Sequence, residues 1–244
     1  MYAIETTALT KRYGTLTAVE ELDLQVRQGE LFALLGVNGA GKTTAIKMLS
    51  CLTQPTDGDG LVGGHSVIRE VEAVKRLIGV SPQETAVAPN LTVAENLALM
   101  CGLHGFSSAK TAAKIDELTR QFSLQEVLHR RAGKLSGGWQ RRVSIAMALI
   151  TEPAILFLDE PTLGLDVLAR RALWDVIRAL KGRTTIILTT HYLEEAEALA
   201  DRIGVMKAGR LLATGTAAEL VARTGADNFE AAFIALVKEA VVCA

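Results

Sequence analysis

Short runs of apolar residues alternate with longer segments of helical periodicity along most of this chain. Four runs of strand length are mostly apolar: Leu31 to Leu35, Leu77 to Val80, Ile155 to Leu158 and Thr185 to Leu188. Continuous apolar runs of this length are typical of strands buried on both faces of a sheet. Because helical segments lie between these runs, the pattern predicts an α/β fold with a largely parallel sheet.

Two other parts of the chain alternate apolar and polar residues, as half-exposed antiparallel strands do. Near the start, these are residues 3–9 and 22–27. Near the end, residues 202–206 and 211–214 flank Lys207-Ala208-Gly209-Arg210, which predicts a hairpin turn. We therefore expect an antiparallel β subdomain in addition to the parallel sheet.

The strand signal disappears between about residues 90 and 150. Thr92, followed by Glu95, has the capping-box pattern of a helix that continues through Leu103, and residues 109–122 are helical again. We interpret this segment as a helical subdomain inserted into the α/β core. The chain is then a single domain with a core of 1–89 and 151–220, a helical subdomain of about 90–150 and a short tail of 221–244.

The strongest chemical signal follows the first apolar run. Residues 36–43 are GVNGAGKT and match the full G-x-x-x-x-G-K-[ST] pattern of a phosphate-binding loop, with a predicted helix after it. The glycines allow backbone N–H groups to surround phosphate oxygens, and the positive end of the helix adds to the attraction. Lys42 is expected to reach the β- and γ-phosphates, and Thr43 to coordinate Mg²⁺. We assign nucleotide binding to Gly36, Val37, Asn38, Gly39, Ala40, Gly41, Lys42, Thr43 and Thr44.

A second motif closes the third apolar run, where Asp159 and Glu160 follow Ile155 to Leu158. Charges at the end of a buried strand are costly unless they have a partner. Asp159 is placed to hold the Mg²⁺. Glu160 is the better candidate for orienting and deprotonating the attacking water. Many strands end in acids at a helix cap, so this motif gains weight only from its position after a phosphate loop.

Composition and charge exclude several other functions. The 26 basic and 27 acidic residues give a formal net charge of -1, so no bulk field recruits nucleic acid or anionic lipid. Cys51, Cys101 and Cys243 are scattered, and we expect reduced thiols in a cytoplasmic protein. We see no secretory signal and no apolar stretch of about 18 residues, so we do not expect the chain to span a bilayer.

The segment Leu135-Ser136-Gly137-Gly138-Trp139-Gln140 stands shortly before the Asp159–Glu160 strand. Together with the two motifs above, it resembles the signature of the ATP-binding subunits of ABC transporters. The resemblance extends from about residue 3 to residue 216. It implies a P-loop NTPase (RecA-like) core with an antiparallel β subdomain and an inserted helical subdomain.

The same resemblance suggests roles for four further residues. Tyr13 is similar to the aromatic residue that stacks on adenine, and Gln83 to the loop glutamine that contacts Mg²⁺ and senses the transmembrane partner. Asp166 lies in a segment that resembles the loop crossing the dimer interface, and His191 resembles the switch histidine at the γ-phosphate. The expected catalytic residues are then Glu160, His191 and Gln83, and the expected metal ligands are Thr43, Gln83 and Asp159.

The signature residues also suggest an anion site on physical grounds. Ser136, Gly137 and Gly138 precede a predicted helix, so their N–H groups and the Ser136 hydroxyl can bind phosphate at its N-terminus. The resemblance implies a head-to-tail homodimer in the ATP-bound state, in which each signature closes the ATP site of the other chain. For the tetrapeptide alone, a serine N-cap followed by flexible glycines is the simpler interpretation.

The resemblance implies that this chain energises transport, with export favoured, through a separate transmembrane permease subunit. It would then lie at the inner face of the cell membrane, with ATP and Mg²⁺ as cofactors and no nucleic acid as partner. ATP closes the dimer, hydrolysis opens it, and the helical subdomain passes the movement to the membrane through a groove around residues 83–97. The order of the motifs, followed by a short tail, is similar to that of exporter ATPases of the drug-resistance type.

Three alternatives belong to other classes. A non-transport ABC ATPase usually carries two cassettes or a long coiled coil, for which this chain has no room. A P-loop kinase or GTPase is disfavoured by the LSGG segment and by the lack of an Asn-Lys-x-Asp segment. A regulatory module that holds ATP without turnover is disfavoured by Glu160 and His191.

Several residues receive structural assignments. Trp139 and Val37 depart from the residues common in the family at these positions, and we expect ATP binding to survive both. We expect Glu194, Glu195 and Glu197 to form a solvated helix face. Core packing is expected for Ile46, Met48, Leu49 and Leu52.

Overall fold

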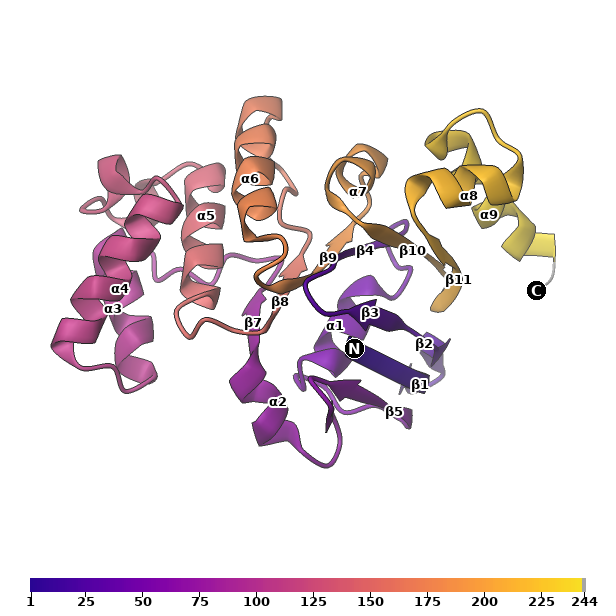
Figure 1. Ribbon diagram of the computed structural model, residues 1–244, viewed down its shortest axis with the longest axis horizontal. Helices are drawn as coiled ribbons and strands as arrows, with labels where there is room; N and C mark the ends of the chain where they lie inside the picture. Colours follow the sequence, from indigo (N-terminus) through magenta and orange to yellow (C-terminus); the bar gives the residue numbers. More distant parts are fainter. Residues whose placement is uncertain (243–244) are drawn as a thin grey trace.

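The structure is a computed structural model that describes residues 1–242. A six-stranded sheet crosses the centre of the molecule, a smaller sheet lies to one side of it, and a group of helices forms the opposite end (Figure 1). The predicted α/β fold with parallel, antiparallel and helical parts is confirmed.

The larger sheet contains the four predicted apolar strands. Its order is β11-β10-β4-β9-β8-β7, in which all neighbours run parallel except the antiparallel hairpin of β10 and β11. Leu35, the last residue of β4, pairs with Thr190 of β9, and Asp159 of β8 pairs with Thr189. The carboxyl ends of three central strands therefore meet at one edge. The strands are β4 (Leu31–Leu35), β7 (Ile78–Ser81), β8 (Ile155–Asp159), β9 (Thr185–Thr190), β10 (Arg202–Lys207) and β11 (Arg210–Gly215).

The smaller sheet is antiparallel and is built around the long first strand. Strand β1 pairs with β2, β3 and β5, and β5 pairs with β6. Residues 22–27, predicted as one strand, instead contain the end of β2, a break and β3. The strands are β1 (Tyr2–Tyr13), β2 (Leu16–Leu22), β3 (Gln25–Arg27), β5 (Asp57–Val62) and β6 (His65–Ser66).

Helices make up the segment in which the strand signal is missing. Helix α3 begins with the predicted capping box, in which the Thr92 hydroxyl accepts from the Glu95 N–H and the Glu95 side chain accepts from the Thr92 N–H. An apolar cluster joins α3 and α4 to α5 through Leu97, Leu118 and Val143. The helical elements are α3 (Val93–Leu103), α4 (Ser108–Gln121), the 3₁₀ turns η1 (Gln125–Val127) and η2 (Ala132–Lys134), and α5 (Gly137–Ala148).

The remaining helices pack against the two sheets or, as α8 and α9 do, form the end of the molecule opposite to α3 and α4 (Figure 1). They are α1 (Lys42–Leu49), α2 (Val71–Leu77), α6 (Val167–Leu180), α7 (Leu193–Leu199), α8 (Ala217–Thr224) and α9 (Phe229–Val242). No helix among residues 1–242 is both long and apolar enough to cross a membrane.

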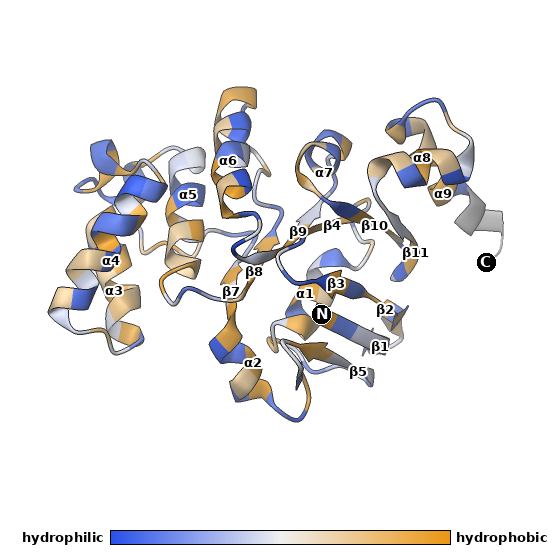
Figure 2. Ribbon diagram, viewed as in Figure 1, coloured by the Kyte–Doolittle hydropathy of each residue, from blue (hydrophilic) through white to orange (hydrophobic). Residues whose placement is uncertain are grey.

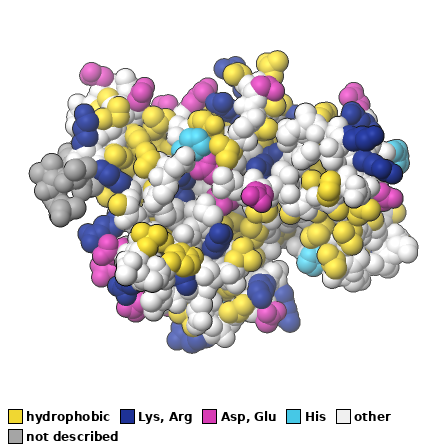
Figure 3. Space-filling view, turned by 180° about the vertical axis from the view of Figure 1, so that it is seen from behind, with side chains coloured by type: hydrophobic (Ala, Val, Ile, Leu, Met, Phe, Trp, Pro, Cys, Tyr) yellow, Lys and Arg dark blue, Asp and Glu magenta, His cyan; other side chains and the backbone are white. Residues whose placement is uncertain are grey.

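The core divides into clusters on the two faces of the larger sheet. Figure 2 shows hydrophobic colour on β7 and β10 and paler colour on β11. Helix α1 lies in the cluster shared by the two sheets, where Ile46, Met48 and Leu49 are buried as expected. The expectation for Leu52 was wrong, because it follows the end of α1 and is 66% exposed. Acidic and basic side chains are interspersed on the surface seen in Figure 3. Cys51 and Cys101 are free thiols, and Cys243 lies outside the described residues.

Candidate active site

The loop between β4 and α1 needs glycine at two positions. A Cβ atom at Gly36 would lie 2.4 Å from the carbonyl oxygen of Met206 and 2.9 Å from the Cβ of Ala40. Gly41 has a φ of 100°, and a Cβ there would lie 2.4 Å from the carbonyl oxygen of Ala18. Both positions are crowded by backbone, so the loop can follow this path only with glycine. The predicted hairpin turn supports it, since the Gly209 N–H donates to the Ala40 carbonyl over 3.0 Å.

Lys42 is the first residue of α1 and its side chain is almost fully buried. Its Nζ donates to the Gly36 carbonyl over 2.7 Å and lies 3.2 Å from a carboxylate oxygen of Glu160. A buried ammonium requires such partners, because desolvation of an unpaired charge is costly. The lysine is thus held over the loop whose N–H groups are predicted to bind phosphate.

The carboxyl end of β8 holds the two acids in different ways. Asp159 Oδ1 accepts from the Thr43 hydroxyl over 3.1 Å and from the Thr189 hydroxyl over 2.5 Å. Glu160 has a φ of 48°, in the left-handed region that is unfavourable for residues with a side chain. Its N–H donates to Thr189 Oγ1 over 3.0 Å. This turn directs the two neighbouring carboxylates to different partners. A strained backbone conformation that is held by hydrogen bonds is typical of functional sites.

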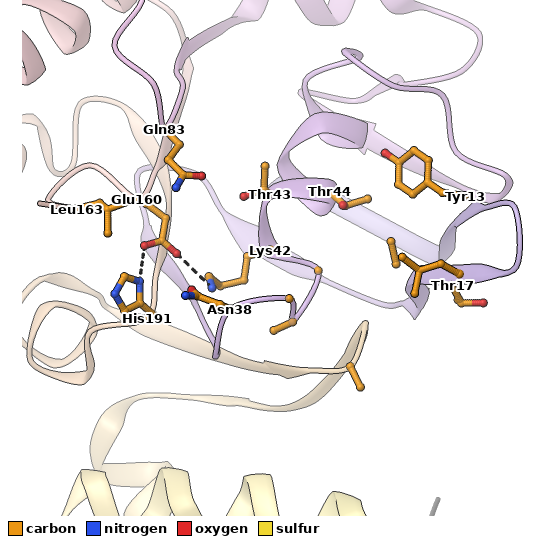
Figure 4. A pocket seen from close by; sticks show the side chains of 16 residues that line it. Tyr13, Thr17, Asn38, Lys42, Thr43, Thr44, Gln83, Glu160, Leu163 and His191 are labelled. Atoms are coloured by element: carbon orange, nitrogen blue, oxygen red, sulfur yellow. Dashed lines mark hydrogen bonds and ion pairs between the residues drawn. The ribbon is translucent and has the colours of Figure 1, made fainter.

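Glu160 also contacts His191, which follows the end of β9. The Glu160 carboxylate lies 2.5 Å from the histidine Nδ1, and only 7% of the glutamate side chain is exposed. Figure 4 shows Glu160 between His191 and Lys42, with Gln83 on its other side. An acid, a histidine and a lysine therefore converge from three segments that are far apart in the sequence.

These side chains border a cavity of about 650 Å³, in which Tyr13 and Thr17 lie at the end opposite to Glu160 (Figure 4). The structure brings together most of the predicted residues here. Those that line the cavity are Tyr13, Asn38, Gly39, Ala40, Gly41, Lys42, Thr43, Thr44, Gln83, Glu160 and His191. Gly36 and Val37 do not line it, and Asp159 reaches it only through its bond to Thr43.

The signature residues and Asp166 do not line this cavity. Ser136 occupies the N-cap position of α5, yet its side chain makes no capping hydrogen bond, and both Ser136 and Gly137 are exposed. Trp139 packs against the apolar cluster of the helical segment, with the Arg142 guanidinium 4.9 Å from its ring. Asp166 is the N-cap of α6 and accepts from the Ala169 N–H. One chain therefore presents its signature away from its own P-loop.

The model of the ABC transporter family matches residues 19–163, which is more than half of the chain. This chain belongs to the ABC transporter family. The predictions of an ATP-binding, ATP-hydrolysing transporter subunit and of a P-loop NTPase fold are confirmed.

The relatives of this ABC ATPase include ATP-binding proteins of drug resistance and export. It is 46% identical to the daunorubicin resistance ATP-binding protein DrrA3 of Streptomyces coeruleorubidus, over 93% of this chain and 72% of that protein. It is 40% identical to the Nod factor export ATP-binding protein I of Paraburkholderia xenovorans, over 93% of this chain and 76% of that protein.

Two solved structures resemble this ABC ATPase along most of its length. One is an ATP-binding subunit of an ABC transporter, with a TM-score of 0.84 and 30% identity over 96% of this chain and 99% of that one. The other is a dimer of the ATP-binding cassette MJ0796 in a post-hydrolysis state with ADP and Pi, with a TM-score of 0.78 and 25% identity. That likeness covers 87% of this chain and 98% of the MJ0796 chain.

Sequence reasoning missed several residues that border the cavity. They are Leu16, Thr17, Ala18, Leu163 and Ala208. The first three begin β2, and the Ala18 carbonyl crowds Gly41. Ala208 lies in the hairpin turn that supports the loop. Their side chains carry no chemistry that a motif could reveal, and only the packing of the two sheets brings them to the cavity.

Glu195 contradicts the expectation of a solvated glutamate face on α7. Glu194 and Glu197 are exposed, but Glu195 is 0% exposed. Its Oε1 accepts from the Trp174 indole N–H over 3.0 Å, whereas Oε2 lacks a hydrogen-bond partner among the described residues. Burial raises the pKa of Glu195, the nearby hydroxyls of Thr190 and Thr162 lower it, and the charge of Glu160 raises it further. The spacing of four residues to the buried Leu199 is the signal that would have placed Glu195 inward.

Replacing Glu195 with glutamine should make thermal stability less dependent on pH. A raised carboxyl pKa means that the folded state binds the proton more tightly than the unfolded state does. The stability that the protonated Glu195 contributes is therefore fully present below the pKa of an unfolded glutamate, about 4.3. This contribution is lost as pH rises through the pKa of Glu195 in the folded state. Glutamine cannot ionise and can still accept from Trp174. Melting curves between about pH 5 and pH 8 should show the wild-type Tm falling relative to the Glu195→Gln Tm. Glu197→Gln, at an exposed position of the same helix, is the control, and parallel curves for Glu195→Gln and wild type would contradict the burial of a neutral acid.

Proposed function

We propose that this ABC ATPase binds ATP with Mg²⁺ in the cavity over the P-loop. Tyr13 lies at the adenine end, and the N–H groups from Gly39 to Thr44 surround the phosphates. Thr43, Asp159 and Gln83 offer oxygen atoms, the ligands that Mg²⁺ prefers, and the bond from Thr43 to Asp159 supports a shared site. When bound, Mg²⁺ neutralises charge on the phosphate oxygens.

The position of Glu160 carries the catalytic proposal. Its carboxylate lies between Lys42 and His191 at the phosphate end of the cavity. Glu160 orients a water molecule and takes its proton as the water oxygen bonds to the γ-phosphorus and the bond to the β–γ bridging oxygen breaks. His191 fixes the Glu160 carboxylate and borders the γ-phosphate. ATP binding must first draw Lys42 away from Glu160, because the phosphates compete for the same ammonium group.

Two chains complete the sites in a head-to-tail homodimer. The exposed Ser136 and Gly137, remote from their own P-loop cavity, support the proposal that they bind the ATP of the partner. Dimerisation of the related MJ0796 cassette supports it as well. The helical subdomain of about 90–150 transmits closure of the dimer to a separate transmembrane permease, which holds the ATPase at the inner face of the cell membrane.

Export of an organic compound is the proposed direction of transport, since the relatives include resistance and export proteins. The test uses inverted membrane vesicles from cells that express the chain together with a candidate permease, a protein with about six apolar spans sought in the neighbouring reading frames. ATP-dependent uptake of daunorubicin into these vesicles is expected, and Glu160→Gln should abolish it while Glu197→Gln leaves it intact. An active ATPase that neither binds these membranes nor drives uptake would contradict the export proposal.

A further inference from the structure

Arg141 is a buried cation with no carboxylate within ion-pair distance in the described part of the chain. The residue lies on α5 and is 5% exposed. It forms no ion pair within 4.0 Å among residues 1–242. Burial lowers the pKa of its guanidinium, and the charge of Asp159 counteracts this. A buried charge of this kind must be stabilised by hydrogen bonds.

The hydrogen bonds of Arg141 reach two consecutive backbone carbonyls of the loop after β7. Nη1 donates to the Pro82 carbonyl over 2.6 Å, and Nη2 donates to the Gln83 carbonyl over 2.5 Å. The planar guanidinium can hold both oxygens at once, which a lysine ammonium at the end of a flexible chain cannot reproduce. The path of the backbone at Gln83, whose side chain borders the nucleotide cavity, is therefore set by Arg141.

Two further contacts join the same two segments. The buried hydroxyls of Ser81 and Ser144 lie 3.0 Å apart, and the Thr85 hydroxyl donates to the Gln140 side chain over 3.4 Å. Gln140, Arg141 and Ser144 lie within the first two turns of α5, directly after the signature glycines. The start of this helix and the Gln83 loop therefore form one hydrogen-bonded unit.

We infer that Arg141 is a positioning residue that couples Gln83, at the nucleotide site of its own chain, to the signature that serves the nucleotide of the partner chain. Any shift of the Gln83 backbone moves the guanidinium, and the guanidinium moves α5 with Ser136 at its N-terminus. Nucleotide in one site thereby aligns the signature for the other site. This inference rests on the proposed homodimer and adds to it a residue that the motifs do not assign.

The test compares Arg141→Met and Arg141→Lys with wild type in two measurements. We expect Arg141→Met to lower kcat for ATP by about 10- to 100-fold, the range that a displacement near 1 Å produces in a reacting site. Affinity for a fluorescent ATP analogue, measured at protein concentrations at which the chain is monomeric, should stay within about two-fold, because the P-loop is intact. Arg141→Lys keeps the charge but not the two-carbonyl contact, so its kcat should lie between the other two.

A dimerisation assay separates this inference from the proposed function. With Glu160→Gln as background, ATP should produce a dimer on size exclusion, and adding Arg141→Met should require about ten times more protein for the same dimer fraction. If Glu160→Gln alone forms no dimer, the proposed function fails; if both form it equally, the role of Arg141 fails.

A matched control is the double variant Ser81→Ala/Ser144→Ala. It removes another contact between the same two segments and leaves both carbonyl bonds of Arg141 in place, so kcat should be unchanged. The role of Arg141 is overturned if kcat of Arg141→Met stays within about two-fold of wild type, or if ATP affinity falls as much as kcat. Should Arg141→Met fail to fold, Arg141→Lys decides by the same criteria.

Discussion

Glu160→Gln should lower the rate of ATP hydrolysis by roughly 10²- to 10⁴-fold, the usual cost of losing a general base. Glutamine has almost the same shape, so the turn after β8 and the contact with His191 should persist. ATP should still bind, and more tightly than in wild type, because Lys42 no longer has a carboxylate at 3.2 Å to compete with the phosphates. Steady-state turnover and equilibrium binding of an ATP analogue measure the two effects separately.

The Glu160→Gln variant should also accumulate as an ATP-bound dimer, since closure needs binding and opening needs hydrolysis. Light scattering with ATP and Mg²⁺ at high protein concentration measures this. Glu197→Gln is the matched control, because this exposed glutamate on α7 contributes to no described ion pair. Wild-type turnover by Glu160→Gln, or a monomer under all these conditions, would contradict the assignment of the base.

Lys42→Ala should weaken ATP binding by about 10- to 150-fold. Hydrogen bonds to charged groups contribute roughly 1.5–3 kcal/mol, and each 1.4 kcal/mol is a factor of ten in affinity. Turnover should fall at least as far, because the lysine is the only side-chain cation that borders the described cavity. Equilibrium binding of a fluorescent nucleotide measures the affinity.

Lys47→Ala is the control for Lys42→Ala, since Lys47 lies on the same helix and is exposed. A melting curve checks folding, because removal of Lys42 leaves Glu160 buried with only His191 and the site less stable. If the alanine variant binds and hydrolyses ATP as wild type does, the P-loop does not hold the phosphates.

The central sheet could be predicted because its strands are buried on both faces and are continuously apolar. The smaller sheet was harder to predict from the sequence. Strand β5 has the sequence DGDGLV, which disfavours a strand, and it forms because it pairs with β1 in the register Ile4 to Val62. Its structure comes from tertiary pairing that local sequence does not encode.

Part of the candidate site could be predicted from the sequence alone. Lys42, Asp159 and Glu160 stand at fixed positions in contiguous motifs, so a short pattern reveals them. Arg141 and Glu195 act through groups that are distant in sequence, the Gln83 carbonyl and the Trp174 indole. Their burial follows from how helices pack on the sheet, and no chemical motif distinguishes Arg141 from half-buried Arg142, or Glu195 from exposed Glu194.

The central claim is that one ATP site needs Lys42 from one chain and Ser136 from the other. It is tested most directly by mixing two variants that we expect to be nearly inactive, Lys42→Ala and Ser136→Arg, and allowing subunit exchange. Ser136→Arg places a long cation where a hydroxyl and backbone N–H groups should bind, and so blocks closure. Each mixed dimer then has one doubly damaged site and one intact site.

The measurement is the ATPase rate as a function of mixing ratio. Sites shared between chains, each able to turn over alone, predict that activity absent from either variant reappears and peaks near equal mixing. Full activity of Ser136→Arg by itself would contradict the account, because the signature would then not contact the reacting nucleotide.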